Sequence, residues 1–127
     1  MIDSLLNFCG ATNTYPHISF TGGDPLLRPD FFQMLEYIEK KRHKGANFTL
    51  RILGNPFLLT RSVIKDLERF EVEKYQISLD GLQETHDNLR KKGSFKESLR
   101  AFNLLQASKI ASACMFSLSK LNANELK

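Results

Sequence analysis

Short apolar runs typical of β-strands alternate with amphipathic helical patterns along the whole chain. The strand-like runs cover residues 17–21, 47–53, 74–79 and 110–118. The patterns between them predict helices over 29–43, after Thr60 and from Ser94 onwards. Successive strands begin roughly 30 residues apart, the length of a β-α-β unit. This alternation predicts an α/β fold with one parallel sheet and right-handed crossovers, formed by a single domain over residues 1–127.

The expected helix ends carry local signals. Pro29 suits a first helical turn, and Thr60 is predicted to be an N-cap. Ser94, with Glu97 three residues later, matches a capping box. Residues 2–9 predict one more short helix before the first strand.

Each strand-like run has one apolar face and polar groups towards its carboxyl end. In the second run, Leu50 and Ile52 alternate with Thr49 and Arg51, and in the fourth run Cys114 belongs to the apolar face. A parallel sheet covered on both faces is almost wholly apolar, whereas polar groups at the carboxyl ends of parallel strands mark ligand sites. The pattern therefore favours a partial (β/α) barrel with parallel strands, outer helices and a polar cavity.

Composition excludes several classes of function. The net charge of +4 on 127 residues is too small to indicate nucleic acid as a partner. Cys9 and Cys114 fit no metal-ligand spacing and are predicted to be buried thiols. The chain shows neither a signal peptide nor an apolar run that spans a bilayer. We therefore expect a cytoplasmic protein without a membrane partner.

Three successive strands end in "FTGGDP", "ILGNPF" and "ISLDG". Glycine lets a ligand approach the backbone closely. Because neighbouring parallel strands lie side by side, Asp24, Asn55, Ser78 and Asp80 are predicted to converge on one rim. Ordinary turn formation also explains Gly, Asn, Asp and Pro at these places, so both readings stay open. A nucleotide-binding P-loop is disfavoured because its glycine-lysine pattern is absent.

These segments resemble the radical S-adenosylmethionine (SAM) enzymes. "ISFTGGDPLLRPDFFQMLEYI" is similar to the second strand and helix of that family, where Gly-Gly-Glu-Pro-Leu-Leu is usual. "ILGNPFLLT" and "FSLSKLNANEL" are similar to its third and fifth strands. "YQISLDGLQETHDNLRKKGSF" resembles the fourth strand of the SPASM/twitch branch, which carries auxiliary clusters in a C-terminal extension. The Leu-Gly-Asn-Pro variant looks most like maturases of ribosomally made peptides.

The resemblance implies a set of SAM-binding residues. Thr21, Gly22, Gly23 and Asp24 match the segment that holds the methionyl amino group. Asp24 replaces the usual glutamate, so its reach is one methylene shorter and a backbone role is favoured over a side-chain role. Asn55 takes the polar position after the third family strand.

The fourth family strand and its loop imply three further residues. Ser78 and Asp80 are expected to face the ribose and carboxylate region of SAM. Arg90 matches an arginine that pairs with the SAM carboxylate, a task that suits the guanidinium fork. The alternative for Arg90 is a solvated charge beside its lysine neighbours.

Glu84, His86 and Asp87 form a further group of titratable residues in the same loop. They could form a catalytic cluster of their own. We expect instead that they cap or orient the loop, since a lone histidine needs a partner to act as a base.

The family's [4Fe–4S] cluster is held by a C-x-x-x-C-x-x-C motif, which this sequence lacks. We therefore expect residues 1–127 to be the central portion of an incomplete radical SAM TIM-like barrel, without the first strand and its cluster loop and without the C-terminal part. The intact parent would hold SAM and the cluster. It would cleave SAM reductively to a 5′-deoxyadenosyl radical, which abstracts hydrogen from a peptide or protein substrate.

The fragment alone is expected to be inactive, and to self-associate through exposed barrel edges. Two alternatives remain open. One is a degenerate, non-catalytic SAM-fold protein that binds a peptide or partner chain. The other is an unrelated α/β domain that binds a small anion at the Gly-Gly loop.

Overall fold

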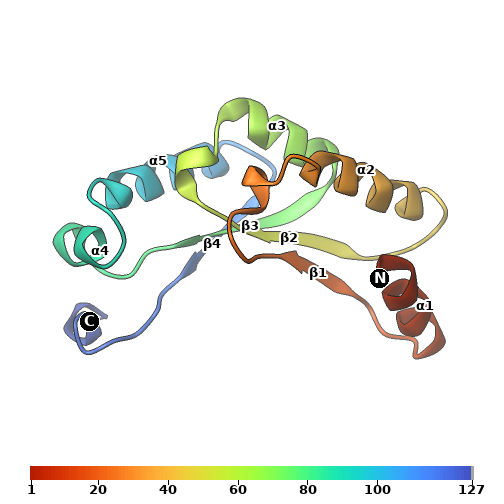
Figure 1. Ribbon diagram of the computed structural model, residues 1–127, viewed down its shortest axis with the longest axis horizontal. Helices are drawn as coiled ribbons and strands as arrows, with labels where there is room; N and C mark the ends of the chain where they lie inside the picture. Colours follow the sequence, from red (N-terminus) through yellow and green to blue (C-terminus); the bar gives the residue numbers. More distant parts are fainter. Residues whose placement is uncertain (127) are drawn as a thin grey trace.

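The computed structural model describes residues 1–126, and its centre is a four-stranded sheet (Figure 1). The strands are β1 (His17–Phe20), β2 (Thr49–Leu53), β3 (Val72–Ser78) and β4 (Ala111–Met115). Every neighbouring pair is parallel, and the spatial order β1-β2-β3-β4 follows the chain. The predicted α/β fold with parallel strands is confirmed, and the curved sheet is consistent with a partial barrel.

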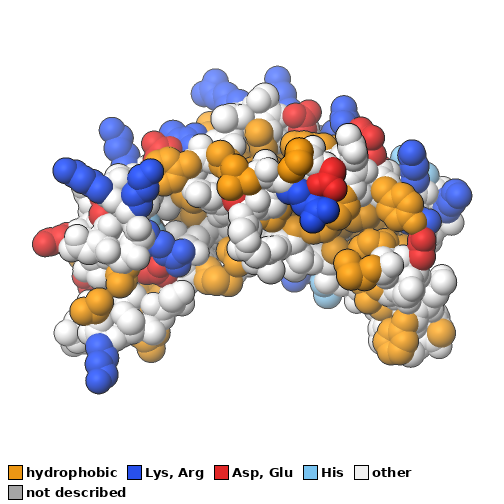
Figure 2. Space-filling model, viewed as in Figure 1, with side chains coloured by type: hydrophobic (Ala, Val, Ile, Leu, Met, Phe, Trp, Pro, Cys, Tyr) orange, Lys and Arg blue, Asp and Glu red, His pale blue; other side chains and the backbone are white. Residues whose placement is uncertain are grey.

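The helices lie mainly on the convex side of this sheet (Figure 1). The structure has α1 (Ile2–Ala11), α2 (Phe31–Arg42), α3 (Arg61–Arg69), α4 (Gln83–Leu89) and α5 (Ser94–Gln106), with short 3₁₀ turns η1 (Pro25–Leu27), η2 (Pro56–Leu58) and η3 (Ala123–Glu125). The space-filling view shows the same arch, hollowed beneath the sheet, with Lys and Arg side chains along the helical side (Figure 2).

The hydrophobic core fills the space between the sheet and the helices. Leu50 and Ile52 of β2 are fully buried there, against core residues from helices such as Leu35 of α2 and Leu67 of α3. The alternate residues Thr49 and Arg51 lie on the other face of the sheet, where they remain partly exposed. The predicted division of the strands into an apolar and a polar face is therefore confirmed for the central part of the sheet.

One predicted helix start is wrong. Pro29 precedes the helix: Asp30 is the N-cap and α2 begins at Phe31. Pro29 and Asp30 form a turn that leads into the helix. Thr60, by contrast, is confirmed as the N-cap of α3, because its Oγ1 accepts a hydrogen bond from the Val63 N–H at 3.2 Å.

Ser94 is not the cap of α5. The N-cap is Gly93, whose φ of +85° suits glycine. The capping acceptor comes from the preceding helix: the Asp87 carboxylate accepts the N–H groups of Gly93 at 2.7 Å and Phe95 at 2.8 Å. A tertiary contact therefore replaces the predicted capping box.

The apolar face predicted for the fourth strand is not buried. Cys114 is exposed, contrary to the prediction of two buried thiols, although Cys9 is buried. Leu118 lies beyond the end of the strand and is 67% exposed. The reason is position, since β4 is an edge strand that pairs only with β3 within the described residues.

We expect the chain to self-associate, because both β1 and β4 are edge strands with open backbone groups. Sedimentation velocity over a range of concentrations should show reversible association. Lysines placed on the two edges by Ser19→Lys and Ala111→Lys should weaken it. Lysines at Gln33 and Gln106, which are exposed on α2 and α5, are the control for added charge. A monodisperse monomer at all concentrations would contradict this prediction.

Candidate functional site

The carboxyl ends of β2 and β3 form one side of a cleft of about 450 Å³. Asn55 follows β2, Ser78 ends β3, and Arg90 follows α4; all three line this cleft. Parallel strands place their carboxyl ends on the same edge of a sheet, so side chains distant in sequence meet there. The structure thus brings together three of the residues predicted for the site.

The Gly-Gly segment forms the adjoining rim at the end of β1. Thr21, Gly22 and Gly23 are exposed, and Gly22 has a φ of +124°, a conformation that side chains rarely adopt. No atom lies within 4 Å of the place where a Cβ on either glycine would stand. The backbone of both residues is therefore open to a ligand.

Asp24 ties this rim to the end of β2. One carboxylate oxygen accepts the Leu26 N–H at 2.8 Å, and the other accepts the Asn55 N–H at 2.6 Å. The Asp24 carboxylate is therefore occupied by two backbone donors.

Asp24 and Asn55 each start the same kind of turn. Each is followed by a proline and a 3₁₀ turn, and each caps that turn by accepting the N–H two residues ahead. For Asn55 the donor is Phe57, at 3.0 Å. Turn formation therefore explains the positions of these two side chains.

Gly54 is required by the tyrosine beneath the rim. Tyr75 is fully buried, and its hydroxyl lies 3.5 Å from the Asn55 carbonyl oxygen, to which it donates. A Cβ on Gly54 would overlap that hydroxyl. Burial raises the pKa of Tyr75, and the negative charge of Asp24 adds to the effect, so the hydroxyl stays protonated as a donor.

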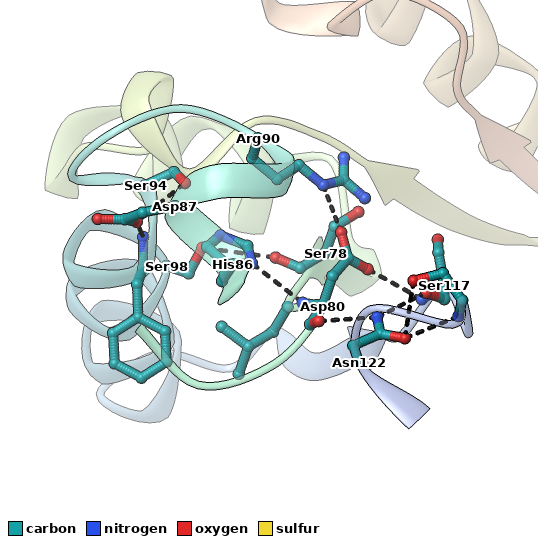
Figure 3. A network of polar contacts seen from close by, with 12 residues as sticks. Ser78, Asp80, His86, Asp87, Arg90, Ser94, Ser98, Ser117 and Asn122 are labelled. Atoms are coloured by element: carbon teal, nitrogen blue, oxygen red, sulfur yellow. Dashed lines mark hydrogen bonds and ion pairs between the residues drawn. The ribbon is translucent and has the colours of Figure 1, made fainter. Parts of the chain in front are cut away.

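Asp80 is the most buried of the predicted site residues, with a side chain 4% exposed. Its carboxylate accepts the Nε–H of Arg90 at 2.5 Å and the N–H of Ser117 at 2.9 Å (Figure 3). Burial opposes its ionisation, but these two hydrogen bonds outweigh that effect and hold the pKa of Asp80 below its usual value.

His86 accepts a hydrogen bond from the backbone of Asp80. Its Nδ1 accepts the backbone N–H of Asp80 at 3.0 Å, which requires a neutral ring with its proton on Nε2. Burial is the main reason that the pKa of His86 is lowered from 6.5. Together with the capping role of Asp87, this confirms that His86 and Asp87 orient the loop; Glu84 is exposed.

Sequence reasoning missed two residues that close this network. Asn122 is fully buried, and its amide nitrogen donates to the carbonyl oxygens of Asp80 and Ser117. Glu125 accepts hydrogen bonds from the Leu82 N–H and the Thr85 hydroxyl. Asp80 lies 42 residues from Asn122, and Leu82 and Thr85 lie 43 and 40 residues from Glu125, so no local pattern reveals these two residues.

Comparison with known proteins identifies the family. The sequence profile of the radical SAM superfamily matches residues 6–127, so the chain belongs to this superfamily. It is 30% identical over 127 residues to an Fe-coproporphyrin III synthase of Methanosarcina barkeri, covering 99% of this chain and 29% of that protein. It is 33% identical over 96 residues to the mycofactocin maturase MftC of Mycobacterium tuberculosis, covering 75% of this chain and 23% of that protein.

Two further matches concern sulfatase-maturating enzymes. A serine-type anaerobic sulfatase-maturating enzyme of Bacteroides thetaiotaomicron is 31% identical over 131 residues, covering 96% of this chain and 30% of that protein. The solved structure of native anSMEcpe with bound AdoMet superposes with a TM-score of 0.64 at 24% identity, over 77% of this chain and 28% of that chain. The latter match supports the fold. The chain spans less than a third of the length of these relatives.

The radical SAM family uses SAM and a [4Fe–4S] cluster. The guanidinium of Arg90 lines the cleft, and a guanidinium is a donor group that suits a carboxylate such as the one that SAM carries. The residues do not fit the cluster. Residues 1–126 contain no group of three or more His, Cys, Asp or Glu side chains that fits a metal ion, and Cys9 and Cys114 lie on separate elements.

Within residues 1–126, no helix combines the length and hydrophobicity that a transmembrane span requires.

We expect the free energy of unfolding to decrease as the pH falls below 6.5. Because folding lowers the pKa of His86 from 6.5, the unfolded chain binds a proton at a higher pH than the folded chain does. The stability from neutral His86 is therefore complete above 6.5 and is lost as the pH falls towards the lower folded value. Urea denaturation at pH 5 to 7.5 measures this, and His86→Gln should flatten the profile.

His43→Gln is the matched control, because the His43 side chain is 77% exposed. It should leave the pH profile unchanged. Equal profiles for the wild type and His86→Gln would show that His86 does not set the pH dependence.

Gly54→Ala should destabilise the chain by about 1–3 kcal/mol, because the new methyl group meets the buried Tyr75 ring. Adding Tyr75→Phe removes the hydroxyl and should recover part of this loss. Gly23→Ala is the control, since open space surrounds the place of its Cβ. Thermal denaturation of the single and double variants provides the test, and additive losses in the double variant would rule out the contact.

Proposed function

We propose that this chain forms the SAM-binding part of a radical SAM enzyme, and that its parent cleaves SAM reductively to modify a peptide or protein. The maturases among its relatives support the peptide substrate. A solved sulfatase-maturating enzyme of the same fold, described with bound AdoMet and a Cp18Cys peptide, adds to that support. The cytoplasm remains our expectation for its location.

One observation carries the proposal: the Arg90 guanidinium lines the cleft while its Nε–H is hydrogen-bonded to Asp80. Its Nε–H donates to Asp80, while the side chain is 42% exposed and lines the cleft with Asn55 and Ser78. A guanidinium has five N–H donors, so the two Nη groups are left to bind a carboxylate bidentately. This favours SAM binding over the alternative of a solvated loop charge.

The remaining roles follow from position. The exposed backbone of Thr21, Gly22 and Gly23 would receive the methionyl amino group, with Asp24 holding that rim in place. Ser78 and Asn55 would contact the SAM molecule along the cleft. When bound, SAM supplies the sulfonium whose cleavage gives the 5′-deoxyadenosyl radical; the residues of this chain bind and orient it.

We propose that the cluster ligands lie outside this sequence, and that this domain is the central portion of a longer barrel. The short coverage of the relatives supports this reading. The chain by itself would then bind SAM without turning it over. A non-catalytic protein that binds a peptide through the same fold is the alternative, and a coding sequence extended upstream without C-x-x-x-C-x-x-C would favour it.

A second candidate substrate class is a tetrapyrrole. The relatives include the Fe-coproporphyrin III synthase and an AdoMet-dependent heme synthase of Methanosarcina barkeri, the latter 31% identical over 87% of this chain. Both classes use the same SAM-binding part. Product analysis of the parent enzyme with a peptide and with a porphyrin would separate the two classes.

SAM binding by this chain is tested by titrating ¹⁵N-labelled protein with SAM. The amide signals of Gly22, Gly23 and Asn55 should shift, because these residues form the rim. Arg90→Ala should weaken binding by about ten- to a hundredfold, as expected for the loss of hydrogen bonds to a charged group. Lys92→Ala is the control, since Lys92 is exposed outside the lining of this cleft. Shifts confined to other surfaces would refute the site.

A further inference from the structure

The carboxylate of Asp80 has almost no surface to offer a ligand. The residue is 3% exposed, and its two oxygens accept hydrogen bonds from Ser117 and Arg90 respectively. Direct contact with a ribose, as the family resemblance implies, would require one of these bonds to break. The buried position favours a role exerted through another residue.

Arg90 is the residue through which Asp80 can act. A guanidinium at the end of a long side chain has many rotamers, and ordering it costs conformational entropy. The charge-assisted bond from Nε to Asp80 fixes the plane and direction of the group. Within the described residues the two Nη groups make no hydrogen bond, and in Figure 3 the dashed line from the guanidinium runs from Nε to Asp80.

Asp80 in turn is held by the segment that follows β4. Asn122 donates to the Asp80 carbonyl oxygen at 2.8 Å and to the Ser117 carbonyl oxygen at 2.9 Å, and its own Oδ1 accepts the Ser119 N–H at 2.7 Å. This places the Ser117 N–H against the Asp80 carboxylate (Figure 3). The direction of Arg90 therefore depends on residues 117–122, which are distant from it in sequence.

We propose that Asp80 is a positioning residue, which turns the free edge of Arg90 towards the cleft, and that Ser117 and Asn122 hold Asp80 in the required place. The inference rests on the proposed function, because it gives Arg90 the carboxylate of SAM to bind. It differs from direct contact with the ligand, which needs an accessible oxygen on Asp80. It also differs from a purely structural role, in which loss of Asp80 affects stability alone.

The first test needs no ligand. In wild-type protein the Arg90 Nε–H is hydrogen-bonded and should exchange slowly with solvent, as measured on its ¹⁵N–¹H signal. Asp80→Asn loses the charge but keeps an oxygen for Ser117, and should speed that exchange by about tenfold. Asp87→Asn is the matched control, because the Asp87 carboxylate accepts backbone N–H groups, as that of Asp80 does from Ser117, but contacts no arginine.

Asn122→Ala tests the second half of the proposal, and decides the matter if Asp80→Asn does not fold. It should speed Arg90 Nε–H exchange although Asn122 does not touch Arg90. Asn103→Ala, an exposed site on α5, is its control. Unchanged exchange in both Asp80→Asn and Asn122→Ala, or equal acceleration in Asp87→Asn, overturns the proposal.

The second test compares SAM with decarboxylated SAM, which lacks the carboxylate. Arg90→Ala and Asp80→Asn should each lower the ratio of the two affinities by about tenfold, and the double variant should lower it no further. If Asp80→Asn weakens both ligands equally, Asp80 contacts the ligand directly and the proposal fails. If Arg90→Ala leaves the ratio unchanged while the exchange results hold, the proposed function fails and the positioning role stands.

Discussion

The buried carboxylate of Asp80 accepts hydrogen bonds from two parts of the chain that meet only in the folded state. One donor is Arg90, at the end of α4, and the other is Ser117, after β4. A buried carboxylate is stable only when its hydrogen bonds are satisfied, so both donors must be in place together. These two hydrogen bonds therefore hold the loop after β3, orient Arg90 and fix the segment that follows the edge strand β4.

The loops that follow β1 and β2 are held by local hydrogen bonds. Asp24 and Asn55 use their side chains to cap turns, and this leaves the backbone of Gly22 and Gly23 as the accessible surface. Turn formation and the proposed ligand binding are therefore compatible, because the side chains stabilise the turns and the turns expose the backbone. The shorter side chain of Asp24 serves this purpose, because it reaches its own turn and the Asn55 N–H at once.

This chain belongs to the radical SAM superfamily, and its relatives have different named roles, among them a heme synthase and a mycofactocin maturase. The family match covers residues 6–127, and the solved structure of native anSMEcpe shares the fold of the described residues. This chain spans less than a third of the length of those relatives, so their named roles apply to it only as proposals.

The sequence alone determined the order of strands and helices, the buried face of the central strands and the meeting of strand ends at one rim, because periodicity and parallel connection are local or topological properties. Only the tertiary structure decided that the Asp80 carboxylate accepts a hydrogen bond from Arg90, that Asp87 rather than Ser94 caps α5, and that Cys114 is exposed. Each of these depends on a partner, or the lack of one, far away along the chain. Hydrogen bonds such as those of Asn122 form between segments that leave no shared pattern in the sequence, so they become visible only when the chain is folded.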